Sequence, residues 1–235
     1  MEAPYVYEPD KPAVAAFNAH ASEALRIQTD VLPEPYLGSK DAPIVLLNLN
    51  PGFDESDYLA YEDGYTRDAW RKNVLHEPLA YPFYFLDPQF SHAGGACWWK
   101  EKLKEPIQIA GAQTVANTIL CIEYFPYHSR RFKPMPTLVA SQRYSFDLAD
   151  QAIDRNAVIV LMRAKRRWED AVPRLSGYPR LFTLKSPIAA AISRRNCVDG
   201  FPLIERFLQN RDPHDCELPV LPSSPSPDNA ETTPC

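Results

Sequence analysis

Apolar residues in this chain form short runs that alternate with helically spaced stripes. The runs have strand length and are closed by turn or polar residues; they lie at 44–49, 118–124, 157–162 and 180–184. Helical spacing marks the segments 11–30, 68–75, 140–156, 166–175, 188–195 and 201–209. This alternation predicts an α/β protein: a three-layer α/β/α sandwich around a four-stranded parallel sheet.

Length and proline content predict the domain organisation. Residues 1–210 of the 235 are expected to form one domain, and residues 211–235, with six prolines, a disordered tail. The connection from Phe53 to Gln113 is long for a compact domain, which is typical of a segment with a function.

Several classes of protein are not expected. The sequence contains no run of 18 apolar residues, so no membrane span is expected, and the amino terminus lacks the features of a secretory signal. The five cysteines include no CxxC pair, which favours reduced thiols and a cytoplasmic location. The histidines lack ligand spacing, so we expect neither a metal site nor a cofactor, and we expect a monomer without a membrane partner.

Charge is distributed unevenly along the chain. Residues 1–64 hold three Lys or Arg against twelve Asp or Glu, whereas residues 125–195 hold fourteen against five. Such asymmetry favours a surface that binds a polyanion such as nucleic acid, although a solvated helical face has the same composition.

The first apolar run ends abruptly in Asn50-Pro51-Gly52, followed by Phe53. In open α/β sheets, ligands bind outside the carboxyl ends of the strands, where this turn is expected. Asn50 is therefore a candidate site residue, with Pro51 and Gly52 holding it. The alternative is an ordinary turn in which Asn50 satisfies only backbone groups.

With its elements in this order, the chain resembles the uracil-DNA glycosylase superfamily over roughly residues 40–210. One motif of that family is Gly-hydrophobic-Asn-Pro-Gly, which Leu49-Asn50-Pro51-Gly52 matches with Asn48 replacing the leading Gly. A second motif, His-Pro-Ser-Pro or Asn-Pro-Ser-Gly, follows the last strand, where this chain has Leu184-Lys185-Ser186-Pro187.

The resemblance implies hydrolysis of the N-glycosidic bond of a base flipped out of DNA. Asn50 is then expected to orient the attacking water. Leu184 occupies the place of the family's His or Asn and cannot donate a hydrogen bond to the departing base. Lys185 could supply positive charge instead, or be a surface lysine, and Ser186 and Pro187 match the segment that pinches the DNA backbone.

The resemblance also implies base recognition at the end of the second strand, here Glu123. A carboxylate offers only acceptors, so we expect a base that presents adjacent N–H groups rather than plain uracil. The alternative is an ion pair of Glu123 with Arg130 or Arg131. His128 is a candidate proton donor or phosphate contact. The candidates for stacking on the base are Phe53, Phe83, Tyr84 and Phe85.

Two other functions remain open. Cys97, behind Gly94-Gly95, could be the nucleophile of a cysteine hydrolase with His92 or His128 as its base. The same fold could also serve as a non-catalytic module that holds nucleic acid or a nucleotide, because the second motif lacks its donor.

Overall fold

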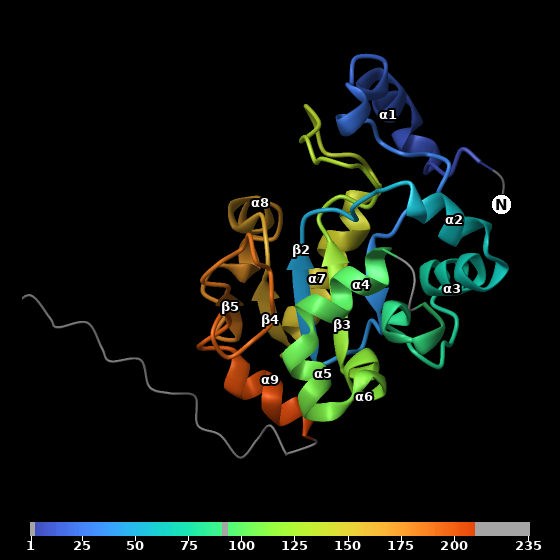
Figure 1. Ribbon diagram of the computed structural model, residues 1–235. Coiled ribbons are helices and arrows are strands. Elements are labelled where there is room, and N and C mark those ends of the chain that lie inside the picture. The colour runs from blue at the N-terminus through green and yellow to red at the C-terminus, as the bar shows by residue number, and fades with distance from the viewer. Residues whose placement is uncertain (1–2, 91–93, 210–235) are drawn as a thin grey trace, which may run out of the picture.

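A five-stranded, mostly parallel sheet forms the centre of the protein. The computed structural model describes residues 3–90 and 94–209, so the expected tail at 211–235 and His92 lie outside the described residues. The strands are ordered β1-β3-β2-β4-β5 (Figure 1). Their bounds are β1 Tyr36–Gly38, β2 Ile44–Asn48, β3 Ile119–Glu123, β4 Val158–Leu161 and β5 Leu181–Thr183.

The four predicted strands all form and run parallel, but the expected count of four is wrong. The fifth strand, β1, pairs antiparallel with β3 at the edge of the sheet, with Tyr36 opposite Ile122. It is only three residues long and lies between Pro35 and Ser39, so it offers too short a pattern to be predicted. The α/β class is confirmed.

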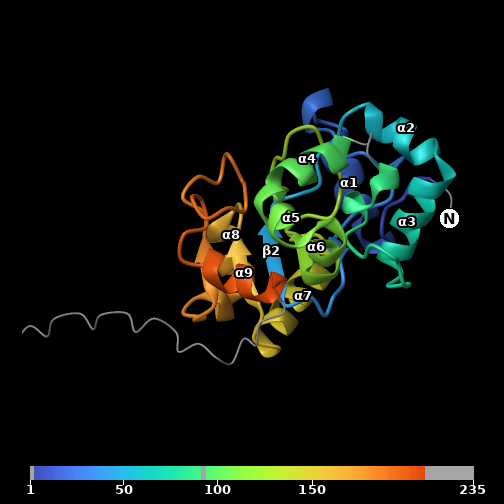
Figure 2. The ribbon, with the colours of Figure 1, turned by 60° about the horizontal axis from the view of Figure 1, so that its bottom comes forward.

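Helices cover both faces of this sheet (Figures 1 and 2). On one face, Ile44 and Leu46 of β2 pack in a core cluster with residues from α3, α4, α6 and α9. On the other face, Val45 and Leu47 pack with residues from α1, α7 and α8. Both faces of β2 are therefore buried, which explains its unbroken apolar sequence.

The helices follow the predicted order with different bounds. Those in the described residues are α1 Lys11–Asn18, α2 Ser56–Glu62, α3 Gly64–Val74, α4 Gly94–Lys102, α5 Lys104–Ala110, α6 Ala112–Thr118, α7 Gln142–Asp154, α8 Lys165–Ala171 and α9 Phe201–Leu208. The long connection between β2 and β3 thus holds α2 to α6, which cover one face of the sheet.

Two helix predictions are wrong. The helix expected over 11–30 ends at Asn18, whose side chain bonds both the amide and the carbonyl of Ile27 at 2.9 Å and so turns the chain back. The segment 188–195 forms turns instead of a helix. The Asn196 side chain there accepts from Ser186 N and donates to the Ala191 carbonyl, which offers the backbone partners other than helical ones.

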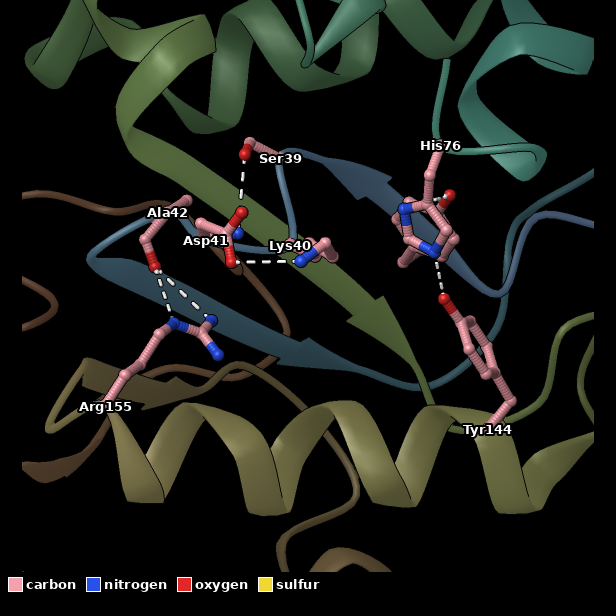
Figure 3. A network of polar contacts seen from close by, with 8 residues as sticks. Ser39, Lys40, Asp41, Ala42, His76, Tyr144 and Arg155 are labelled. Atoms are coloured by element: carbon pink, nitrogen blue, oxygen red, sulfur yellow. Dashed lines mark hydrogen bonds and ion pairs between the residues drawn. The ribbon is translucent and has the colours of Figure 1, made fainter. Parts of the chain in front are cut away.

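Polar contacts tie the edge strand and its turn to the neighbouring helices (Figure 3). Arg155, at the end of α7, donates twice to the Ala42 carbonyl just before β2, at 3.3 Å each. His76, after α3, meets Tyr144 of α7 at the other end of this network. These contacts fix the side of the sheet where β1, α3 and α7 meet.

Because the strands β2 to β5 are parallel, four chain segments lie at the carboxyl end of the sheet. Asn48, Glu123 and Leu161 end β2, β3 and β4, and residues 184–187 follow β5. Among the helices of the described residues, none is long and apolar enough to cross a membrane.

Candidate functional site

A cleft of about 590 Å³ opens at the carboxyl ends of β2, β3 and β4. The segment after β2, the end of β3 with the loop that follows it, and helices α3 and α4 line this cleft. The lining residues are Glu34, Asn48 to Asp54, Asp57, Trp70, Phe85, Gly94, Gly95, Trp98, Trp99, Glu123, His128 to Phe132, and Arg163. Its size and its mixture of aromatic and convergent polar groups are typical of a small-ligand site.

Asn50 is held in one orientation at this cleft. Its Nδ2 donates to the Pro51 carbonyl at 2.8 Å and to Ser129 Oγ at 3.1 Å. No residue in the described part of the chain donates to its Oδ1. The loop is fixed as well, because Ser129 N donates to the Pro51 carbonyl and Phe125 N to the Leu49 carbonyl. Asn50 therefore presents an acceptor that can bind and orient a water.

Asn48 and Glu123 form a buried pair at the base of the cleft. They are register partners on β2 and β3, with exposures of 5% and 3%. Asn48 Nδ2 donates to Glu123 Oε1 at 3.0 Å, which leaves Asn48 Oδ1 and Glu123 Oε2 buried without hydrogen-bond partners among the described residues. The alternative of an ion pair with Arg130 or Arg131 is wrong, since Arg130 pairs with Glu55 and the contacts of Glu123 are with Asn48 and Cys121.

Burial raises the pKa values of the acids that line the cleft. It raises the pKa of Glu123 to about 7, although the hydrogen bonds from Asn48 and Cys121 and the charge of Arg163 oppose the shift. Burial also raises the pKa of Asp57 to about 6 and that of Glu34 well above its ordinary value. Glu34 accepts hydrogen bonds from Trp70 Nε1, at 2.8 Å, and from the Tyr84 hydroxyl. The interior of the cleft is therefore acidic and poorly solvated.

Aromatic rings form the walls of the cleft. Phe53 and Phe85 line it as expected from the sequence, together with the three tryptophans Trp70, Trp98 and Trp99. Phe83 and Tyr84, the other stacking candidates, are core residues outside the lining, with Phe83 packed edge-on against Trp99. Phe132 also lines the cleft, and six phenylalanine and tryptophan rings around one space are suited to enclosing a flat ring system.

The glycines at the start of α4 bring that helix close to the wall. A Cβ placed at Gly95 would lie 2.6 Å from the ring of Phe85. Only a residue without a side chain lets the helix approach the ring this closely. Gly95 thus positions Trp98 and Trp99 at the cleft.

Three arginines lie on the solvent side of the lining, and we call them the basic rim: Arg130, Arg131 and Arg163. Arg130 and Arg131 are exposed and Arg163 is half-buried. Arg163 lies 5.8 Å from the centre of the Trp98 ring. The basic rim thus places part of the basic sequence region at the opening of an acidic cleft.

His128 lines the cleft but does not fit the expected role. Burial lowers its pKa to about 4, so the ring is neutral near neutral pH. Its Nδ1 lies 2.8 Å from the Gly52 carbonyl, where the neutral ring donates a hydrogen bond. This environment does not support the predicted role as a proton donor or phosphate contact, and the hydrogen bond to Gly52 shows that His128 supports the turn after Pro51.

The second motif lies apart from the cleft lining. Lys185, Ser186 and Pro187 are exposed, and none of them is among the lining residues. Ser186 Oγ accepts from Ala189 N at 3.3 Å, which is a local turn contact. Leu184 is 5% exposed and packs in the core cluster that also holds residues of α9. The expected catalytic roles of Lys185 and Ser186 thus have no support in this geometry.

Cys97 is exposed on α4 and is not among the lining residues. His128, one of its two proposed bases, lines the cleft with its Nδ1 bound to the Gly52 carbonyl, and the other, His92, lies outside the described residues. The cysteine-hydrolase alternative therefore has no assembled site in the described residues.

Sequence reasoning missed several lining residues: Glu34, Asn48, Trp70, Trp98, Trp99 and Arg163. The position of Asn48 could have been predicted from the sequence. Asn48 lies two residues after Leu46 on the same face of β2, and its register partner Glu123 lies on that face of the neighbouring strand. Glu34 could have been predicted too, as the one acid within the apolar stretch 31–37. Trp70 and Trp99 could not, because tryptophans in a core and in a site look alike in sequence.

Among the described residues, no group of three or more His, Cys, Asp or Glu is arranged to hold a metal ion. No protein-family model, curated protein or solved structure matches this chain. The cleft itself therefore carries the functional argument.

Proposed function

We propose that this protein is a DNA glycosylase-like hydrolase that cleaves the N-glycosidic bond of a damaged or deaminated base flipped into the cleft. The observation that carries the proposal is the fixed amide of Asn50, whose Oδ1 is available beside an aromatic cleft with acceptors at its base. A flipped base needs this combination: rings to stack on, polar groups to read its edge, and an oriented water near C1′.

Asn50 Oδ1 accepts a hydrogen bond from the water and aligns its lone pair with C1′. The amide cannot rotate freely, because Pro51 and Ser129 hold its nitrogen. Since the sugar develops oxocarbenium character in the transition state, positioning a neutral water contributes more than generating hydroxide.

DNA reaches the cleft through the basic rim. Arg131 and Arg163 lie at the opening, where they can contact phosphates on either side of the flipped nucleotide. The exposed segment Lys185–Pro187 follows β5 at the same carboxyl end of the sheet and provides a further backbone contact. In this proposal Lys185 and Ser186 bind DNA and do not take part in bond cleavage.

A second function is favoured by one observation. Leu184, which occupies the place where the resembled family has a donor for the departing base, is an apolar core residue outside the cleft lining, so this position does not stabilise an anionic leaving group. A non-catalytic module that binds nucleic acid or a nucleotide on the same fold has no need of that donor.

Assays of abasic-site formation separate these two functions. Duplexes that each carry one uracil, hypoxanthine or alkylated purine are incubated with the wild type and with Asn50→Ala. If the protein is a glycosylase, we expect base release from at least one duplex, at a rate that is about 10²–10³-fold lower in the variant. DNA binding by both proteins without any base release would favour the binding module.

A further inference from the structure

The cleft combines two charge environments that a neutral base does not require. The titratable side chains buried in its lining are the acids Glu34 and Glu123 and the neutral His128, and Asp57 is half-buried beside them. Burial raises the pKa of Glu123, and a positive charge bound next to this carboxyl would lower that pKa again and favour its ionised form. The cations of the lining belong to the basic rim, where they are exposed or half-buried. A ligand that fits both regions carries positive charge inside the cleft and negative charge outside it.

We propose that the base accepted by this cleft is a positively charged purine, alkylated on a ring nitrogen. This inference rests on the proposed function and names its substrate class. A nucleotide with such a base carries its positive charge on the ring and its negative charge on the flanking phosphates, which matches the charge pattern of the cleft and rim.

The unpartnered atoms at the base of the cleft support this class. Asn48 Oδ1 and Glu123 Oε2 are buried acceptors on neighbouring strands, and the amide donor of Asn48 is already bound to Glu123 Oε1. A buried polar atom without a partner is rare in native proteins and calls for an occupant. A guanine alkylated at N7 offers two adjacent N–H donors as well as its charge.

The rings of the wall provide a second contribution. Trp70, Trp98 and Trp99 line the same space as the buried acids, and Trp98 already has the cations of Lys102 and Arg163 at 5.5 Å and 5.8 Å. Tryptophan faces attract cations more strongly than other aromatic rings do. A cationic purine gains both stacking and cation–π attraction there, whereas a neutral base gains only stacking.

A cationic purine substrate would also explain why Leu184 can occupy the second motif. When the C1′–N9 bond of a cationic purine breaks, the bonding electron pair moves to N9 and neutralises the ring charge, so the base departs uncharged. Water adds to C1′ of the oxocarbenium ion and loses its proton to the solvent. Because no anion forms, the reaction needs no donor at Leu184, and its apolar, buried side chain is compatible with catalysis.

Two measurements on the full chain test the inference. The first compares binding of the nucleosides 7-methylguanosine and guanosine by quenching of tryptophan fluorescence, under conditions in which the methylated ring is cationic. We expect roughly tenfold tighter binding of the cation from its charge and cation–π contacts. Glu123→Gln, which keeps an acceptor for Asn48, is expected to remove most of this preference, while Glu62→Gln on the exposed surface of α2 keeps it.

The second measurement compares single-turnover release of 7-methylguanine, hypoxanthine and uracil from matched duplexes. Release of the cationic base alone, or at least tenfold faster, supports the inference. Release of the neutral bases alone, or equal binding of both nucleosides, overturns it and leaves the glycosylase proposal standing. If no base is released while the binding preference is present, the glycosylase proposal fails and the assignment of a cationic ligand stands.

Asp57→Asn provides a second variant in case Glu123→Gln does not fold. Asp57 lies in the half-buried wall, where the change to an amide of the same shape removes charge only. A reduced preference for the cation in this variant supports the inference. A preference that both folded variants retain in full contradicts it.

Discussion

At the scale of single residues, Glu123 shows how much of the site depends on burial. The sequence indicated an acid at the end of a strand but not its depth, its hydrogen bond from Asn48 or its unpartnered Oε2. The same holds for His128, which was a candidate proton donor or phosphate contact and is buried, with a lowered pKa. Side-chain environment depends on long-range packing, so residue types near a motif indicate candidates but not their protonation states.

The buried carboxyl of Glu123 predicts a pH-dependent stability. Its pKa rises on folding from 4.5 to about 7, so the folded protein binds this proton more tightly than the unfolded chain. The stabilisation is complete below pH 4.5 and is lost as the pH rises through about 7.

The glutamine in Glu123→Gln does not titrate, so the variant does not lose this stabilisation as the pH rises. Its free energy of unfolding relative to the wild type is expected to rise by about 1–3 kcal/mol between pH 5 and pH 8. Urea unfolding at several pH values measures this difference. Glu62→Gln is the control and should follow the wild type, and a pH-independent difference for Glu123→Gln would count against a buried, titrating carboxyl.

At the scale of elements, the buried strands were predictable and the irregular segments were not. An apolar run such as 44–48 has few alternatives once both of its faces are covered. In contrast, side chains at Asn18 and Asn196 bond distant backbone groups and end or prevent helices that the apolar spacing predicts. The helices α4 to α6 were not predicted because they lie in a connection whose sequence is rich in aromatic residues.

The close packing of α4 against Phe85 can be tested by a substitution at Gly95. Gly95→Ala places a methyl group 2.6 Å from the ring, so the helix or the ring has to move. Overpacking of this kind is expected to lower the free energy of unfolding by about 1–3 kcal/mol and to disturb the tryptophan wall. Chemical denaturation gives the first effect and tryptophan fluorescence the second.

Gly64→Ala is the matched control, because a Cβ at Gly64, the first residue of α3, meets nothing within 4 Å. We expect it to be neutral or slightly stabilising. If Gly95→Ala behaved like Gly64→Ala, the close approach of α4 to the wall would be wrong.

At the scale of the whole molecule, the fold brings a basic segment to the opening of an acidic cleft. The net charge of −5 hides this arrangement, and the sequence showed it only as an asymmetry between two regions. Many of the basic residues form ion pairs within the protein, such as Arg194 with Glu105 and Glu205. The number of cations left for the proposed contact with DNA is therefore smaller than the composition indicates.

The basic rim predicts a salt dependence for DNA binding. Arg131→Ala and Arg163→Ala are each expected to weaken binding and to reduce the slope of log K against log salt by about one, the effect of one lost phosphate contact. Arg143→Ala is the control, because Arg143 lies on α7 behind the sheet and pairs with Asp147. Titrations by fluorescence anisotropy at several salt concentrations give the slopes. Equal slopes for all three variants would place the DNA elsewhere on the molecule.

The proposed function requires Asn50 to direct water to C1′ of a nucleotide whose base lies in the cleft. Single-turnover base release in ¹⁸O-labelled water, with mass analysis of both products, tests this role of Asn50. We expect one labelled oxygen on the abasic sugar, none in the free base, and a rate that falls by about 10²–10³-fold in Asn50→Ala. Equal rates for the wild type and the variant, or the absence of an abasic product from every modified duplex, would contradict it.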